Sequence, residues 1–186
     1  KGVVFGLSGG IDSAVTAALC SKSFESEQIL GIIMPEKESN DSSRILAEKV
    51  AKKFNFKTEI MDITKILESF GVYDLKEKVV KEKFPQFTSE CKYRVVVPPK
   101  SKNIIGIPFL EILDEENKTH KLKISSSDFL TLTAATSIKH RVRMTSLYFH
   151  GEKNKFSVVG TTNKTEYQQG YFVKYGDGGS DIEPLV

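Results

Sequence analysis

The chain has 186 residues, of which 39% are hydrophobic, so it is long enough for one sizeable core and too short to favour two. Lys and Arg total 27 against 24 Asp and Glu, and the formal net charge of +3 is too small to indicate a nucleic acid or a membrane surface as a partner. Cys20 and Cys91 are too few for a disulfide framework or a cysteine-based zinc site, which favours a reducing, cytoplasmic setting. No apolar run approaches membrane-spanning length.

The first third of the chain alternates between strand and helix patterns. Short apolar runs predict buried strands at residues 3–7 and 29–34, and a third strand is expected at residues 57–63. Helical spacing predicts helices at residues 13–22 and 43–54. The residues expected to form their buried faces are Ala14, Val15, Ala18, Leu19, Ile45, Leu46, Val50 and Phe54. Apolar strands that alternate with amphipathic helices indicate a doubly wound α/β fold, a parallel sheet with helices on both faces.

Between residues 67 and 126 this rhythm breaks. The segment IPFLEILDEENKTHKLKI alternates apolar and polar residues on both sides of a polar turn, which predicts an inserted β-hairpin. Ser127 or Asp128 is expected to cap a long helix that runs to Phe149, and residues 156–159 predict another short buried strand. The residues that this helix is expected to bury are Phe129, Leu132, Ala135, Ile138 and Val142. We therefore expect a single domain at 1–186 with an insertion at 67–126, truncated at one or both ends.

The stretch FGLSGGIDSAV has the glycines of a phosphate-binding loop without the lysine of the G-x-x-x-x-G-K-[ST] pattern. Residues 8–13, here called the glycine loop, join a strand to a helix N-terminus, where backbone N–H groups and the helix dipole favour an anion. Gly9 and Gly10 permit close backbone approach, and the hydroxyls of Ser8 and Ser13 add donors. Asp12 would repel a bare phosphate, so its presence indicates a divalent metal such as Mg²⁺ between carboxylate and phosphate. A glycine turn that only caps a helix is the alternative.

Two motifs resemble known families. SGGIDS resembles the SGGxDS signature of the N-type ATP pyrophosphatases, the PP-loop superfamily. This resemblance implies an adenine nucleotide alpha hydrolase-like fold and cleavage of ATP between its α and β phosphates. VVGTTNKTEYQQGYFVKYGDGGSDIEPL closely resembles a stretch of the NAD synthetases, and SIKHRVRMTSLY resembles that family's N-I-Q-A-R-x-R-M helix. Ser137 and His140 depart from the family, which usually has Asn and Ala at these positions.

The resemblance to NAD synthetases implies a role for individual residues. Asp12, Glu166 and Asp177 are the expected catalytic residues, and Asp12 and Glu166 the expected Mg²⁺ ligands. The residues expected to bind ATP are Gly6, Ser8, Gly9, Gly10, Asp12, Ser13, Met34, Arg141 and Thr161. Those expected to bind the second substrate are Ser137, Phe172, Lys174 and Asp177.

Some of these residues have simpler readings. The carboxylates of the glycine-rich segment at 176–181 could belong to a solvated turn, and aromatic residues such as Phe172 could be core. KHRVR could form a small basic patch for RNA, but it lacks the interleaved aromatic residues of nucleic-acid binders. His120, His140 and His150 have no metal-ligand spacing, and none is predicted to be catalytic.

The reaction implied by the resemblance is amide formation. The carboxylate of nicotinic acid adenine dinucleotide attacks the α-phosphorus of Mg-ATP, pyrophosphate leaves, and ammonia displaces AMP to give NAD. A homodimer is implied too, with the long helix as an interface element. No glutaminase lies within the chain, so the use of glutamine would need a missing domain or a separate glutaminase.

Two other functions stay open. Ser137, His140 and the insertion favour a relative that amidates a different carboxylate by the same adenylation. A non-catalytic ATP-binding subunit is the second alternative. Asp12, Glu166 and Asp177 argue against it, because a pure binder does not need paired metal carboxylates beside a pyrophosphate site.

Overall fold

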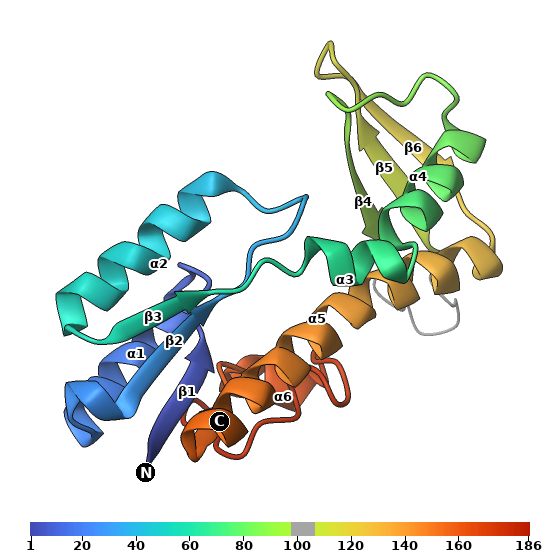
Figure 1. Ribbon diagram of the computed structural model, residues 1–186. Coiled ribbons are helices and arrows are strands. Elements are labelled where there is room, and N and C mark those ends of the chain that lie inside the picture. Colours follow the sequence, from blue (N-terminus) through green and yellow to red (C-terminus); the bar gives the residue numbers. More distant parts are fainter. Residues whose placement is uncertain (98–106) are drawn as a thin grey trace. The chain divides into compact units, whose positions relative to one another are not determined.

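The computed structural model describes residues 1–97 and 107–186, and it divides into two compact units (Figure 1). The first unit consists of residues 1–69 and 137–186, and the second of residues 70–136. The second unit overlaps the insertion predicted at 67–126. No helix among the described residues is both long enough and apolar enough to cross a membrane.

The first unit is built on a four-stranded parallel sheet. Its strands, in the order β3-β2-β1-β7, are β3 (Lys57–Ile60), β2 (Ile29–Ile33), β1 (Gly2–Gly6) and β7 (Phe156–Val159). Its helices are α1 (Ile11–Ser23), the 3₁₀ helix η1 (Ser26–Gln28), α2 (Asp41–Phe54), α3 (Thr64–Ser69), α6 (Lys164–Gln169) and the later part of α5 (Ser126–Asn154). The doubly wound parallel sheet predicted from the sequence is confirmed.

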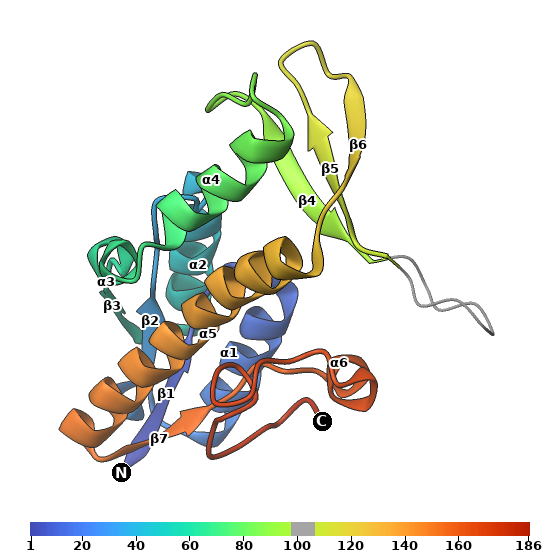
Figure 2. The same ribbon diagram turned by 90° about the vertical axis from the view of Figure 1, so that its right-hand side faces the viewer.

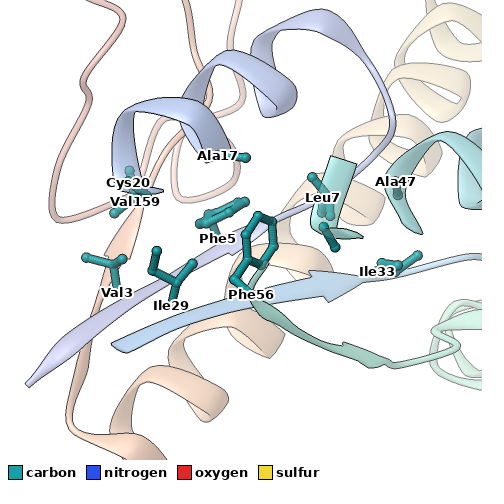
Figure 3. Close-up of a cluster of buried hydrophobic side chains, with 11 residues drawn as sticks. Val3, Phe5, Leu7, Ala17, Cys20, Ile29, Ile33, Ala47, Phe56 and Val159 are labelled. Carbon is teal, nitrogen blue, oxygen red and sulfur yellow. The ribbon is translucent and has the colours of Figure 1, made fainter. Parts of the chain in front are cut away.

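Successive residues of β1 point to opposite faces of the sheet, and each face has its own apolar cluster. Phe5 is fully buried on the face covered by α1 and α2, where its ring meets Phe56 edge-on at a centroid distance of 5.6 Å (Figure 3). Val4 packs on the other face against Met144 and Leu147. These two residues belong to α5, which crosses that face of the sheet in Figure 2. Helices therefore cover both faces of the sheet.

The predicted buried faces of the first two helices are wrong in part. Val15 and Leu19 of α1 are 42% and 40% exposed, whereas Ala17 and Cys20 are buried. In α2, Ile45 and Leu46 are 53% and 48% exposed, and the residues that pack inward are Ala47 and Ala51. Each helix has two stripes at helical spacing, and the stripe of small side chains faces the sheet. Small residues let a helix axis lie close to the strands, a preference that hydrophobicity alone does not reveal.

The predicted boundaries of two elements also shift. Helix α5 begins at Ser126, because Ser125 and Asp128 form reciprocal side-chain to backbone hydrogen bonds of 3.0 and 3.2 Å that cap it. The helix continues to Asn154, past the expected end at Phe149. Strand β3 ends at Ile60, three residues before the predicted end.

The second unit is a small antiparallel sheet with helical cover. Its elements are α4 (Val72–Lys83), β4 (Lys92–Val96), β5 (Phe109–Leu113), β6 (Thr119–Lys123) and the first residues of α5. Strands β5 and β6 form the predicted hairpin, and β4, which the sequence did not predict, pairs with β5. Leu110, Ile112 and Leu132 lie in its core, which is separate from the clusters of the first unit.

Asp114 fixes the hairpin turn. Its carboxylate accepts hydrogen bonds from the N–H groups of Glu116 and Lys118 at 3.0 and 2.8 Å, and it lies 2.6 Å from His120 Nε2. The contact with His120 and these N–H groups hold the pKa of Asp114 below its usual value. The turn therefore keeps an ionised carboxylate as its organising acceptor.

Truncation of Phe5 tests the assignment of the two helix faces. Phe5→Ala should lower the free energy of unfolding by about 4 kcal/mol, because it removes a fully buried ring from the cluster under α1 and α2. Leu19→Ala, on the outer face of α1, should cost about 0.5 kcal/mol or less. Urea unfolding followed by circular dichroism measures both. A loss at Leu19 as large as that at Phe5 would contradict the assigned face.

Candidate functional site

A cleft of about 750 Å³ lies where the parallel strands of the first unit end. The segments that follow β1, β2, β3 and β7 all contribute to its wall, with Ser8, Met34, Asp62 and Gly160 among the lining residues. The chain runs from β1 to β2 and β3 on one side and returns to place β7 on the other side of β1. Ligands of open α/β sheets bind at such a switch point, outside the carboxyl ends of the strands.

The glycine loop is held by hydrogen bonds among its own residues. The hydroxyls of Ser8 and Ser13 are 3.1 Å apart, the Ser13 hydroxyl donates to the Gly10 carbonyl at 2.9 Å, and the Gly10 N–H donates to Ser8 Oγ at 3.2 Å. Ser13 is 3% exposed. Because the first N–H groups of a helix have no partner within it, the N-terminus of α1 presents donors and a positive dipole beside this loop.

Gly9 occupies a position that no other residue could take without strain. Its φ of 81° lies in the left-handed region, and a Cβ there would collide with the carbonyl oxygen of Ser43 in α2. The glycine therefore lets α2 approach the loop closely. Ser43 and Arg44 of α2 also line the cleft.

Asp12 and Glu166, the expected Mg²⁺ ligands, both line the cleft. Glu166 also caps α6: its Oε2 accepts from the Asn163 N–H at 3.0 Å, and Asn163 Oδ1 accepts from the Glu166 N–H at 3.0 Å. Among the described residues, no group of three or more His, Cys, Asp or Glu could hold a metal ion. Two carboxylates nevertheless suit Mg²⁺, which commonly takes one or two of them and completes its shell with phosphate oxygens and water.

Asp177 also lines the cleft, in the loop that follows α6. Its Oδ1 accepts from the Val173 N–H at 2.9 Å and lies 3.4 Å from His140 Nδ1. Burial raises the pKa of Asp177, but hydrogen bonding with His140 and the Val173 N–H outweighs it and leaves that pKa below its usual value. This carboxylate is therefore ionised near neutral pH.

Asp181 anchors the end of that loop. Its Oδ2 accepts from the Val158 N–H at 2.8 Å, and its Oδ1 lies 2.8 Å from the hydroxyl of Tyr148. Burial, and then the neighbouring Asp181 carboxylate, raise the pKa of Tyr148 to about 12. Asp181 thus ties the loop to β7 and α5.

Neither of the α5 residues expected to bind a ligand, Ser137 and Arg141, is among the described residues that line the cleft. His140, Arg143, Met144 and Leu147 line the cleft at a helical spacing. Arg141 is exposed, and its Nε donates to the Lys174 carbonyl at 3.1 Å.

The aromatic residues that follow α6 are not core. Tyr171 and Tyr175 are 75% and 72% exposed, and the Phe172 ring, 38% exposed, stacks on Tyr167 at 5.9 Å. The Lys174 ammonium lies 4.9 Å from the centroid of the Tyr175 ring. These exposed faces leave the segment free to meet a planar ligand.

The structure brings together nine of the predicted site residues. Those that line the cleft are Gly6, Ser8, Gly10, Asp12, Ser13, Met34, Thr161, Glu166 and Asp177. Those absent from the described lining are Gly9, Ser137, Arg141, Phe172 and Lys174. The ligand contacts assigned to the residues of both groups stay predictions.

Several charged and polar residues of the cleft escaped the sequence analysis. They include Lys37, Arg44, Asp62, Arg143 and Thr162. Arg143 carried a sequence signal, because it belongs to the SIKHRVRMTSLY motif and lies three residues after His140. Lys37, Asp62 and Thr162 follow strands, and Arg44 lies in the first turn of α2. The sheet topology was therefore needed to place them in the cleft.

The fold and the glycine loop together define an α/β protein of the PP-loop class. The family profile described as NAD synthase matches residues 1–97 and 103–186. The chain belongs to the NAD synthase family.

Curated relatives and solved structures agree with this family. The NH(3)-dependent NAD(+) synthetase of Mesorhizobium japonicum is 37% identical over 187 residues, which cover 100% of this chain and 59% of the relative. That of Thermotoga maritima is 35% identical over 188 residues, covering 100% of this chain and 61% of the relative.

Among solved structures, the NH3-dependent NAD synthetase of Campylobacter jejuni superposes with a TM-score of 0.63 at 26% identity, over 99% of this chain and 57% of that one. The NMN synthetase of Francisella tularensis does so with a TM-score of 0.65 at 25% identity, over 100% and 56%. The chain thus spans less than two thirds of the length of each of these four proteins.

Glu183 lies close to the cleft wall without lining the cleft itself. Its Oε1 accepts from the Ser180 hydroxyl, and its buried Oε2 has no hydrogen-bond partner within residues 1–97 and 107–186. A Cβ on Gly160, which lines the cleft, would collide with this carboxylate. Burial raises the pKa of Glu183, and the Ser180 hydroxyl opposes this only in part.

Glu183→Gln should change how stability depends on pH. A raised folded-state pKa means that the stability contributed by Glu183 is present below its ordinary value of 4.5 and is lost as the pH rises through the folded-state pKa. The stability of wild type relative to Glu183→Gln should therefore fall between pH 4 and pH 7, as measured by urea unfolding across this range. Ser180→Ala should extend that fall to higher pH. A pH-independent difference would contradict the raised pKa.

Proposed function

We propose that the protein catalyses ATP-dependent amidation of nicotinic acid adenine dinucleotide by ammonia, giving NAD, AMP and pyrophosphate. The observation that carries this proposal is the meeting of the glycine loop, Asp12, Glu166 and Asp177 in one cleft at the carboxyl ends of the strands. The names of the relatives support the reaction.

The glycine loop is suited to hold the phosphate groups that leave. Its serine hydroxyls and the N-terminus of α1 supply donors for the pyrophosphate oxygens, and the loop is ordered by its own hydrogen bonds before any ligand binds. Asp12 and Glu166 would hold Mg²⁺, which when bound neutralises charge on the phosphate oxygens. Pre-ordered donors favour cleavage at the α-phosphorus because they stabilise the charge that develops on the leaving group.

Asp177 is placed to act on the amidation step. It lies in the same cleft and is ionised near neutral pH, so it could orient the incoming amine and accept its proton. No protein nucleophile is needed, since the substrate carboxylate attacks ATP and ammonia then displaces AMP. Ammonia could come from solution or from a separate glutaminase.

A mononucleotide acceptor is the second candidate. The NMN synthetase of Francisella tularensis resembles this chain as well as the NAD synthetase structure does. His140, which departs from the family pattern, lies 3.4 Å from Asp177 on the wall of the cleft. An imidazole there changes the pocket in which the acceptor carboxylate would lie, which favours a test of nicotinic acid mononucleotide.

The homodimer implied by the resemblance belongs to the proposal as well. Phe149 on α5 is 59% exposed, which suits an interface that includes this helix.

Product analysis distinguishes the two acceptors. The full-length protein is incubated with Mg-ATP, ammonium and either nicotinic acid adenine dinucleotide or nicotinic acid mononucleotide. AMP and NAD should form in equal amounts with the dinucleotide. Turnover of the mononucleotide alone would favour the second candidate. If AMP forms with neither the dinucleotide nor the mononucleotide, both candidates are overturned.

Asp12→Asn tests the metal ligand. The change removes one charged ligand, so pyrophosphate release should fall about 100-fold or more while the protein still binds ATP. Coupled pyrophosphate detection and calorimetric titration with ATP measure the two properties. Asp74→Asn, at an exposed position on α4, is the matched control and should keep wild-type turnover. Unchanged turnover in Asp12→Asn would refute its role.

A further inference from the structure

Lys139 on α5 carries a buried charge that the proposed chemistry does not use. The residue is 8% exposed, and its Nζ lies 2.8 Å from Glu36 Oε1 and 2.6 Å from Glu38 Oε2. The Glu36 side chain is 6% exposed, so this pair is almost fully removed from water. Lys139 is not among the described residues that line the cleft.

Glu36 and Glu38, the two carboxylates paired with Lys139 here, belong to one loop of the cleft wall. Residues 34–40, here called the β2 loop, follow β2 and lead into α2. The segment contributes Glu36 and Ser39 to the lining of the cleft, besides Met34 and Pro35. Its shape is therefore part of the shape of the cleft.

Glu36 is the centre of this loop. While its Oε1 accepts from Lys139, its Oε2 accepts from the Glu38 N–H at 3.1 Å. The Glu36 N–H donates to Ser39 Oγ at 2.9 Å, and the Ser39 N–H donates back to the Glu36 carbonyl at 2.8 Å. One carboxylate thus joins the turn of the loop to a lysine on a different element.

The free-energy cost of burying these charges bears on the role of the ion pair. Desolvation offsets much of the attraction within a buried ion pair, so such a pair adds little to the stability of the fold. Buried ion pairs are better known for fixing a segment in one conformation. Loss of Lys139 alone would remove a positive charge from beside two carboxylates of the loop that lines a site proposed to bind an anion. The arrangement therefore controls the conformation and the charge of the β2 loop together.

We propose that Lys139 is a positioning residue that holds the β2 loop, through Glu36 and Glu38, in the conformation that binds ATP. This inference rests on the proposed occupation of the cleft by ATP. Lys139 does not touch the nucleotide. It acts through the two glutamates, which sets it apart from a lysine that binds phosphate directly.

The test measures binding in the full-length protein, so it does not depend on turnover. The probe is α,β-methylene-ATP with Mg²⁺, an analogue that cannot be cleaved between its α and β phosphates, and calorimetry gives the Kd. Lys139→Met should raise the Kd about tenfold or more, the factor expected for loss of hydrogen bonds between charged groups. Lys139→Arg should retain most of the affinity. Lys153→Met, which removes an exposed lysine from the last turn of α5, should leave the Kd unchanged.

The double variant Glu36→Gln/Glu38→Gln separates positioning from simple charge. It removes two negative charges near the site, so an electrostatic effect alone would tighten binding of the anionic nucleotide. Release of the β2 loop should instead weaken binding about tenfold. Tighter or unchanged binding in this variant, or a wild-type Kd in Lys139→Met, would overturn the inference.

Thermal unfolding shows whether each variant folds. If Lys139→Met does not fold, the Kd values of Glu36→Gln/Glu38→Gln and Lys139→Arg decide whether Lys139 has the positioning role. If the wild type binds the analogue and the variants show the expected order of Kd, the positioning role stands even when no acceptor is amidated. In that case only the proposed reaction fails.

Discussion

The parallel pairing of β1 with β2 on one side and β7 on the other is the constraint on which the site depends. Because all four strands of this sheet run in one direction, each ends at the same edge, and the segments that follow them meet there. The glycine loop and residues 160–162 are more than 140 residues apart in sequence, yet both line one cleft. The apolar clusters on the two faces keep the strands in this register, so the core positions the cleft.

Several polar groups of the cleft are already used by the fold. Glu166 caps α6 with one carboxylate oxygen, and Asp177 accepts the Val173 N–H. Ser8 and Ser13 bond to each other and to the backbone of their loop. Such bonds restrict the rotamers of the side chains before a ligand arrives, which lowers the entropy lost on binding.

A feature of this arrangement can be predicted from the sequence when the residues that form it lie close together along the chain. The four strands of the parallel sheet, the β5–β6 hairpin and the glycine loop follow from contiguous patterns, and they were predicted, whereas β4 was not. The inner face of α1 was not, because Val15 and Leu19 satisfy helical spacing as well as Ala17 and Cys20 do, and only the closeness of the sheet chooses between them. Arg141 of α5 was expected to bind ATP, whereas the described residues of this helix that line the cleft begin at its neighbour His140. The pair of Lys139 with Glu36 joins residues 103 positions apart, so no local pattern records it.

Two adjacent residues of α5 connect the two sides of the cleft. Lys139 holds the β2 loop, and His140 lies beside Asp177 in the loop after α6. Neighbouring residues on a helix point about 100° apart, so one turn of α5 reaches both walls. A shift of this turn would therefore change the β2 loop and the Asp177 loop together. If the cleft binds ATP and an acceptor carboxylate as proposed, the residues at these two positions of α5 bear on both ligands, and acceptor choice would depend on α5 as well as on the motif that contains Asp177.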